Sequence, residues 1–456
     1  MIEVDLKDYK PKYTDWTETD YEESSLRYCE PMTAHALEEE SEQDLLLNNP
    51  QYIIEEKFDG TRGILHFLND GCRVFSRRIS KKTNWFTENT DSLPQMRDIF
   101  IPELSGTVID GEMFIPDRPF KDVSATLNCK WDKAIERQLE LGYIVFHAFD
   151  ILYYKGIRIE RLSLKRRKVF LRKVIDVLES RGIKCIVEVP YFQCGLKDNN
   201  GRYIPVKRPA SLLSRIKGFD KKYPTLYSDI KRSSSPLTLN LSPRGYYEFI
   251  VATGGEGVII KDTKGKYEHK RSRGFLKIKK FYTRECILLG FTEPTKYYDG
   301  KFPDDSWDYW EEPKGVVSSN NWKDFSAKDL LRKGYKPLTK FYFNQWVGNM
   351  IFGVIITNDE IKSLPKNKKF NIHEVELCGP PCNDRTLYKV LEVGECSGFD
   401  DELRANLSHY DYKGKVIEVK CNEIFKDTGK LRHPRFLRFR DDKDPEECTY
   451  YNHITE

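Results

Sequence analysis

Short apolar runs alternate with polar turns through the first 280 positions of this chain. Residues 52–60 predict a strand that enters a glycine turn, and residues 63–78 predict a hairpin around Asn69–Gly71. Residues 106–117 predict a second strand pair around a glycine turn. The apolar and aromatic run at 143–156 is typical of a buried strand. This part of the chain is therefore expected to build antiparallel sheets.

Two segments of the same half have helical signals. Apolar residues recur every three or four positions within 163–181, at Val169, Leu171, Val174, Ile175 and Leu178. Gly182 is placed to stop that helix. Residues 246–262 predict a helix, a glycine break and a short strand. Sheets with flanking helices indicate the α+β class.

After Phe281 the pattern changes to strands separated by turn signals. Five strands are predicted, at 285–293, 350–358, 388–398, 415–425 and 435–441. Five strands in this arrangement suit a small barrel of the OB-fold type. We expect a first domain at 1–283, with a loop-rich insertion at 197–244, and an OB-fold domain at 284–456, with an insertion at 296–345.

Composition narrows the class of protein. The chain has 456 residues, of which 39% are hydrophobic, and this length favours two or three domains. No apolar run approaches 18 residues, and the N-terminal segment is charged, so neither a membrane span nor a secretory signal is expected. We expect a soluble, intracellular monomer in the cytoplasm, nucleoid or nucleus.

Cysteine and charge add less. Cys378 and Cys382 have a spacing found in zinc sites, but no matching second pair is present, and a proline-rich turn between two thiols is the alternative. The net charge of +4 is small, but its distribution is uneven. Residues 17–45 are acidic, whereas 264–284 and 431–440 are strongly basic and carry interleaved apolar residues. The basic stretches are candidates for contact with nucleic acid, although charge runs also occur on solvated faces.

The candidate chemistry begins at EKFDGTRG, residues 56–63. A lysine at the end of a strand, beside a tight turn, can act as a nucleophile once it is deprotonated. Nearby positive charge and partial burial favour the neutral form of a lysine. Asp59 and Gly60 would shape the turn, and Arg62 could hold phosphate with its fork of donors. This motif alone is also compatible with an ordinary surface turn.

Five further motifs follow Lys57 in order, namely IDGE at 109–112, FDIL at 149–152, EGVIIK at 256–261, LKIKK at 276–280 and RFLRFRDDK at 435–443. In order and spacing, the six pieces resemble motifs I, III, IIIa, IV, V and VI of the covalent nucleotidyltransferases. That superfamily includes ATP-dependent DNA ligases, RNA ligases and mRNA capping enzymes. The resemblance implies a nucleotidyltransferase (adenylation) domain followed by an OB-fold domain.

Within this superfamily the chain most resembles ATP-dependent DNA ligases. RHPRFLRFRDDKDPEE at 432–447 is similar to the DNA-ligase form of motif VI, and FSRR at 75–78 is similar to a segment that follows motif I. The expected two-domain plan resembles the compact ligases of phages and viruses. The resemblance implies a reaction with ATP that seals nicks in duplex DNA through lysyl-AMP and DNA-adenylate intermediates.

The resemblance assigns nucleotide-binding roles to several residues. Lys57 attacks the α-phosphate, and Arg62 and Arg77 hold the ribose and phosphates. Glu55 contacts adenine, for which the alternative is a solvated strand residue. Phe149 stacks on adenine, for which the alternative is an ordinary core aromatic. Glu112 binds ribose and helps to place a metal, for which the alternative is a salt bridge in a hairpin.

The remaining residues act on phosphate and metal. Lys261, Lys277 and Lys279 neutralise the α-phosphate and the charge of the transition state, and strand alternation places Lys277 and Lys279 on one face. Arg440, Asp442 and Lys443 orient the departing pyrophosphate. Glu112 and Glu256 would bind Mg²⁺, and Mn²⁺ is expected to be able to substitute for it.

Two classes of alternative stay open at this point. An RNA ligase or a capping guanylyltransferase would use the same chemistry with another base or acceptor, and the wording of motif VI argues against both. A non-catalytic nucleic-acid-binding relative would have kept the scaffold without the reaction, and the presence of every key residue disfavours it. NAD⁺ is not expected as the donor, because neither a cysteine-rich zinc finger nor an NMN-binding segment is recognisable.

Overall fold

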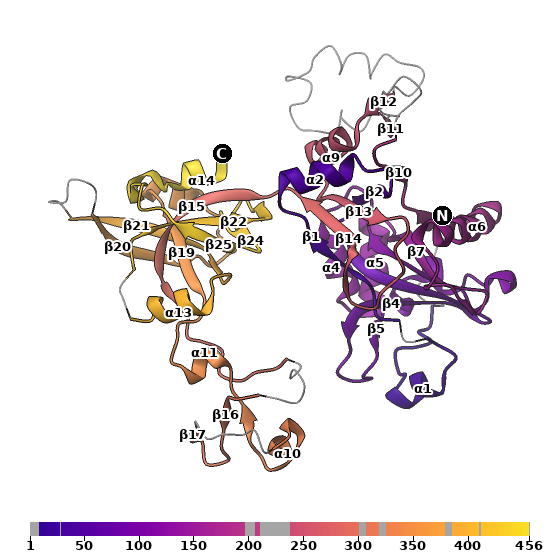
Figure 1. Ribbon diagram of the computed structural model, residues 1–456, viewed down its shortest axis with the longest axis horizontal. Coiled ribbons are helices and arrows are strands. Elements are labelled where there is room, and N and C mark those ends of the chain that lie inside the picture. Colours follow the sequence, from indigo (N-terminus) through magenta and orange to yellow (C-terminus); the bar gives the residue numbers. More distant parts are fainter. Residues whose placement is uncertain are drawn as a thin grey trace. The chain divides into compact units, whose positions relative to one another are not determined.

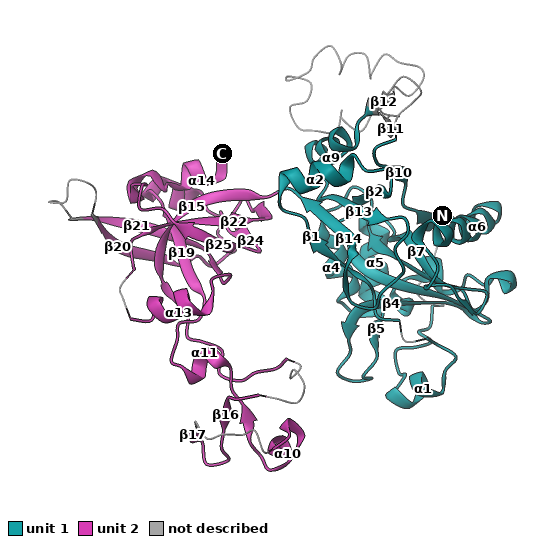
Figure 2. Cartoon of the chain, in the orientation of Figure 1, with its two compact units in different colours: residues 1–280 teal, residues 281–456 magenta. Residues whose placement is uncertain are grey.

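The computed structural model divides into two compact units, residues 1–280 and 281–456 (Figures 1 and 2). Each unit has apolar cores of its own. The described residues are 9–27, 29–196, 206–209, 238–300, 307–318, 325–378, 385–409 and 412–455.

The first unit contains two sheets. Sheet I has the order β1-β14-β13-β2-β10, and only β1 and β14 run parallel to each other. Its strands are β1 (Thr33–Ala36), β2 (Tyr52–Lys57), β10 (Tyr191–Gln193), β13 (Gly257–Asp262) and β14 (Arg271–Lys279).

Sheet II has the order β5-β4-β3-β6-β7-β8, and β9 pairs with β7. Its strands are β3 (Thr61–Leu68), β4 (Gly71–Ile79), β5 (Phe86–Glu88), β6 (Val108–Phe114), β7 (Val145–Tyr154), β8 (Ile157–Arg158) and β9 (Ile186–Glu188). The chain crosses from sheet I to sheet II through residues 58–60, directly after Lys57. The mixture of antiparallel pairs and helices is the α+β architecture that the sequence predicts.

Helices cover the two sheets on their apolar faces. The core of sheet I includes residues from α2 (Glu40–Leu47) and α9 (Pro243–Ala252). The core of sheet II includes residues from α3 (Pro94–Arg97), α4 (Phe120–Leu127) and α6 (Leu164–Ser180), and Leu141 of α5 (Trp131–Leu141) packs against it. The other elements of this unit are α1 (Glu18–Glu23), the 3-10 turns Thr90–Ser92 and Pro102–Leu104, β11 (Val206–Pro209) and β12 (Thr238–Leu241). Apart from β11, β12 and the start of α9, the predicted insertion 197–244 lies outside the described residues.

The alternation of strand residues decides which side chains reach the helices. Val258, Ile260, Leu276 and Ile278 belong to the core beneath α2 and α9. Because successive strand residues point to opposite faces, their neighbours in β13 and β14 point the other way. Sheet I therefore buries aliphatic residues on one face and presents lysines on the other.

One strand prediction in the first unit is wrong. Residues 108–114 form the single strand β6 in place of a strand pair around a glycine turn. The cause lies at Gly111, where an added Cβ would overlap the Phe146 ring and lie 2.6 Å from the His147 carbonyl oxygen. This glycine permits close packing of β6 on β7, and it does not mark a turn. The hairpin at Asn69–Gly71, the strand at 143–156 and the helix that ends before Gly182 are confirmed, although Val169 of that helix is 56% exposed.

A buried ion pair joins α6 to β7. Arg167 donates to both carboxylate oxygens of Asp150, at 2.7 and 2.9 Å, and both side chains are fully buried. Asp150→Ala leaves the Arg167 guanidinium buried without its counter-ion, so we expect the free energy of unfolding to fall by about 3–5 kcal/mol. Denaturant titration measures this change. Asp176→Ala, which breaks an exposed pair with Arg172 on the same helix, is the control and should cost less than about 1 kcal/mol. Equal losses in the two variants would contradict the prediction.

The second unit is built on one six-stranded sheet with the order β20-β21-β19-β15-β22-β25. Its strands are β15 (Tyr282–Phe291), β19 (Met350–Ile355), β20 (Ile372–Cys378), β21 (Arg385–Cys396), β22 (Val416–Cys421) and β25 (Arg435–Phe439). A bridge between Ser397 and Arg435 connects the end of β21 to β25. The five strands β21, β19, β15, β22 and β25 therefore form a closed ring. All five predicted strands are present, and the OB-fold assignment stays a prediction.

The sixth strand, β20, was not predicted. It pairs with β21 along its whole length at the edge of the sheet, and exposed Glu374 and Glu376 interrupt its apolar residues. Edge strands often carry charged residues, which weaken the sequence signal. Of the two cysteines with a spacing found in zinc sites, Cys378 ends β20 and Cys382 lies outside the described residues.

Within the insertion predicted at 296–345, the described residues include a small sheet around buried Trp310. It consists of β16 (Trp310–Glu311), β17 (Val317–Ser318) and β18 (Lys336–Pro337). The other elements of the unit are α10 (Ala327–Arg332), α11 (Lys340–Phe343), α12 (Asn358–Ser363), α13 (Asp401–Leu407), β23 (Glu423–Ile424), β24 (Leu431–Arg432), the 3-10 turn Pro445–Glu447 and α14 (Tyr450–Thr455). Among the residues described, no helix has both the length and the apolar character needed to cross a membrane.

Candidate active site

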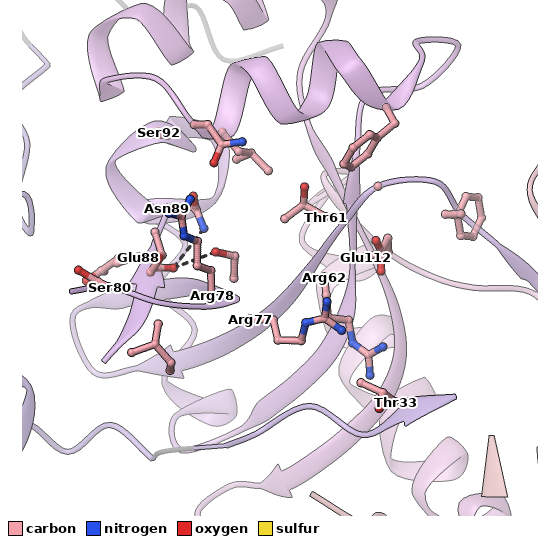
Figure 3. Close-up of a pocket in the computed structure, with 18 of the residues that line it drawn as sticks. Thr33, Thr61, Arg62, Arg77, Arg78, Ser80, Glu88, Asn89, Ser92 and Glu112 are labelled. Atoms are coloured by element: carbon pink, nitrogen blue, oxygen red, sulfur yellow. Dashed lines mark hydrogen bonds between the residues drawn. The ribbon is translucent and has the colours of Figure 1, made fainter. Parts of the chain in front are cut away.

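A pocket of about 1470 Å³ in the first unit is lined by strands of both sheets (Figure 3). Sheet I contributes Glu55, Lys57, Lys261, Lys277 and Lys279. Sheet II contributes Arg62, Arg77, Glu112 and Phe149. Nine of the residues that the sequence singles out therefore surround one cavity, although the chain separates them by more than 200 positions.

Lys57 lies at the end of β2, where the chain leaves sheet I. Its ammonium group forms an ion pair with Glu256, and the second oxygen of the same carboxylate pairs with Lys279. Glu256 directly precedes β13, and Gly257 of that strand is the pairing partner of Lys57. The carboxylate thus holds two of the pocket lysines beside each other.

The turn after Lys57 is held close to β6. A Cβ at Gly60 would overlap the carbonyl oxygen of Met113, so the turn can approach β6 this closely only without a side chain there. Asp59 is half-buried in the turn and is not among the residues that line the pocket. The turn-shaping role of Asp59 stays a prediction.

Arg62 is fixed by a buried network. It donates to both oxygens of Asp110, each at 2.6 Å, and to the Met32 carbonyl oxygen at 2.9 Å. The Tyr267 hydroxyl donates to Asp110 at 2.5 Å. Although burial opposes it, the Asp110 carboxylate raises the pKa of Arg62 above its usual value. Its guanidinium group also lies 4.4 Å from the centre of the Phe149 ring. Arg62 therefore enters the pocket already charged and oriented.

Phe149 is half-buried, so its ring is not simply part of the core. It lines the pocket, with the Lys261 ammonium 4.2 Å from its centroid. The ring is available on the pocket side for stacking with a planar group.

Glu55 is buried, which excludes the solvated position. Its two oxygens pair with Lys168 of α6 and with Lys261 of β13, each at 2.6 Å. Burial lowers the pKa of Lys261 to about 8. Lys261 therefore lies beside Glu55 and the Phe149 ring in the lining of the pocket.

Glu112 of sheet II and Lys277 of sheet I both have shifted pKa values. Burial raises the pKa of Glu112 to about 7, against the effect of Lys57 and Arg62. Burial, together with the positive charges of Lys279 and Lys57, lowers the pKa of Lys277. The shift of Lys277 reflects the closeness of the pocket cations, which suits the binding of a polyanion.

Arg77 extends this positive lining along β4. Its side chain is exposed, and the pocket continues past it to Arg78 and Ser80, which are labelled in Figure 3. Tyr13 and Trp16 of the N-terminal segment form part of the same lining. The rings of both lie over the guanidinium of Arg73, at 3.5 and 4.1 Å from their centroids.

Three of the predicted residues lie in the second unit. Arg440 pairs with Asp442 at 2.8 Å and also with Glu285. Lys443 pairs with Glu447 at 3.0 Å and lies 3.7 Å from Glu285. Within the second unit, the structure brings these three side chains together around Glu285.

Sequence reasoning missed Lys168, Asp110 and Tyr267. Asp110 stands inside the IDGE motif, so its position was a usable signal. Lys168 and Tyr267 carried none, because their contacts arise from the packing of α6 and of the 263–270 loop. No group of three or more His, Cys, Asp or Glu side chains that could hold a metal ion is found in the part of the chain that the structure describes.

His147 packs against the rings of Phe58 and Phe114, whose centroids lie 4.6 and 4.5 Å from its own. Burial lowers the pKa of His147 to about 4. As the pH falls below about 6.5, His147 becomes protonated in the unfolded chain but stays neutral in the folded chain. The free energy of unfolding therefore falls as the pH falls. His147→Phe keeps the packing, so we expect it to remove about 3 kcal/mol of the stability lost between pH 7 and 4. Urea unfolding of both proteins across this range measures the difference, and parallel stability profiles would contradict it.

Residues 31–190 match the family model described as ATP dependent DNA ligase domain. DNA ligase 4 of Kluyveromyces lactis is 24% identical over 306 residues, which cover 62% of this chain and 28% of that protein. DNA ligase 2 of Methanosarcina acetivorans is 24% identical over 412 residues, which cover 87% of this chain and 53% of that protein. The chain thus spans between about a quarter and a half of the length of these relatives.

Among solved structures, one described as a structure-function analysis of Lig E DNA ligases aligns with 90% of this chain and 98% of that chain. The sequence identity is 16% and the TM-score is 0.45.

Proposed function

We propose that this chain, whose residues 31–190 match the model of the ATP dependent DNA ligase domain, seals nicks in duplex DNA with ATP. The single observation that supports the proposal best is the pocket in which Lys57 meets five further predicted cations, a half-buried aromatic ring and Glu112. A lone nucleophilic lysine could have many uses. A lysine beside a ring for stacking and cations for phosphates fits a nucleoside triphosphate.

In the first step, Lys57 loses a proton and its Nζ attacks the α-phosphorus of ATP. A nitrogen–phosphorus bond forms, the bond to the β-phosphate oxygen breaks, and pyrophosphate leaves. Lys277 and Lys279 would neutralise the charge that develops on the α-phosphate. Phe149 would stack on the base, and Arg62 would meet the ribose and phosphates.

In the later steps, AMP moves from Lys57 to the 5′-phosphate at a nick, and the 3′-hydroxyl then displaces AMP. Arg77 and the exposed Arg78, the next residue of β4, would contact the backbone phosphates. The second unit would supply Arg440, Asp442 and Lys443 by closing over the nucleotide during the first step.

Mg²⁺ fits the donor set of the pocket. Hard carboxylate oxygens suit this ion, which commonly takes one or two of them together with substrate phosphates and water. Glu112 and Glu256 would hold it, and when bound it would neutralise phosphate charge.

Incubation with ATP labelled at the α-phosphate and Mg²⁺ tests the first step. We expect an acid-labile, hydroxylamine-sensitive label on the protein, with little or none from GTP or NAD⁺ run in parallel. Nicked DNA and nicked RNA–DNA hybrids, each carrying a 5′-phosphate, then test the acceptor. Absence of label with every donor would favour a non-catalytic nucleic-acid-binding protein.

A further inference from the structure

One carboxylate and two ammonium groups are buried together at the inner wall of the pocket. Glu55 pairs with Lys168 through one oxygen and with Lys261 through the other, each at 2.6 Å. The three side chains are 2%, 3% and 2% exposed, respectively. Two buried cations thus share one buried anion.

The surrounding groups do not remove this excess of positive charge. Asp150, which faces Lys261 from β7, is already engaged by Arg167 through both oxygens. Glu188 of β9 interacts with Lys168 but also pairs with Arg172, at 3.4 Å. The ring of Tyr191 lies 4.5 Å from the Lys168 ammonium. Burying an extra ammonium group costs stability, and an apolar side chain in its place would avoid that cost. Stability therefore does not explain why a lysine is buried at position 168.

The position of the three groups relative to the pocket supplies that reason. Glu55 and Lys261 line the pocket, whereas Lys168 reaches Glu55 from α6 and is absent from the lining. Phe149 lies next to Lys261, so the Glu55 carboxylate is near the ring on which a base would stack. An ionised carboxylate accepts hydrogen bonds but cannot donate them. It can bind the exocyclic amine of adenine, and it cannot bind the carbonyl that guanine carries at the same position.

We propose that Lys168 is a positioning residue for base selection, which holds the Glu55 carboxylate in place so that the pocket takes ATP in preference to GTP. Lys168 acts through Glu55 and does not touch the nucleotide. Its ammonium group remains as counter-ion to Glu55 when Lys261 turns toward the substrate. The inference rests on the proposed function, because it concerns the donor of that reaction.

The test compares self-adenylylation with ATP and self-guanylylation with GTP in the full chain. For Lys168→Met, we expect the ATP-to-GTP ratio of labelling efficiency to fall about 10- to 100-fold, the effect of one hydrogen bond to a charged group. The change should lie in the nucleotide concentration at half-maximal rate, with the maximal rate little altered. Lys168→Arg should retain most of the wild-type ATP-to-GTP ratio, since it keeps the positive charge. Lys165→Met, an exposed lysine of the same helix, is the matched control and should leave the ratio unchanged.

Glu55→Gln gives a second measurement that does not depend on how α6 tolerates a substitution. A carboxamide can donate as well as accept, so this variant should also lose the preference for ATP. If wild-type protein takes label from no nucleotide, the proposed function fails. If wild-type protein takes label from ATP but Lys168→Met or Glu55→Gln keeps the wild-type ratio, the inference about Lys168 is wrong and the proposed function stands. Should Lys168→Met not melt cooperatively, Lys168→Gln replaces it, and the same outcomes decide.

Discussion

Lys57→Arg is expected to reduce labelling by α-labelled ATP to background, although the positive charge at this position is kept. A guanidinium group stays protonated in proteins, so it has no free nitrogen lone pair with which to attack phosphorus. The fold should tolerate the change, because an arginine can still pair with Glu256 and the position is half-buried. Sealing of a nick that carries only a 5′-phosphate should be lost together with the label.

Two measurements separate loss of the nucleophile from loss of the site. Lys264→Arg, at an exposed lysine of the same unit, should label as the wild type does. Binding of ATP to Lys57→Arg, followed by equilibrium titration, should persist, because Phe149 and the remaining cations are unchanged. Full labelling of Lys57→Arg would show that another residue is the nucleophile.

The sequence could predict the pocket residues that depend on local periodicity. Lys277 and Lys279 share a face because a strand alternates, and their neighbours Leu276 and Ile278 are in the core as that rule requires. The order of the motifs further predicted that Lys57, Glu112 and Phe149 would meet. The structure agrees, since β2, β6 and β7 all border one cavity.

Contacts that depend on packing between distant elements could not be predicted in this way. In the sequence, Lys168 is one of several basic residues of an amphipathic helix. Only the packing of α6 against the sheets brings it to Glu55. Gly111 reads as a turn signal, yet it lies within a strand because the Phe146 ring packs over it. The strand β20 shows the same limit, since its pairing with β21 and not its own composition makes it a strand.

Arg440→Ala and Lys443→Ala are expected to separate the first step from the last. Within the second unit these cations are held by Glu285, Asp442 and Glu447, so they form a pre-arranged group. The Asp442 side chain raises the pKa of Arg440 further, which keeps the guanidinium charged. If this group orients the β- and γ-phosphates, it is needed only while pyrophosphate is still attached. We therefore expect self-adenylylation to fall at least ~100-fold, the loss seen for one preorganised charge-stabilising donor.

Sealing of a nick that already carries a 5′-adenylate should remain within about threefold of wild type in both variants, because no pyrophosphate is present to orient. Lys277→Ala should impair both reactions, since each passes through an α-phosphate beside that lysine. Lys415→Ala, which removes an exposed pair with Asp441 in the same unit, is the control and should affect neither. The alternative is that β25 ends in a solvated charged segment with no part in catalysis. In that case folded Arg440→Ala and Lys443→Ala, checked by thermal melting, would lose both activities together or keep both, and the assignment of this group to pyrophosphate release would be wrong.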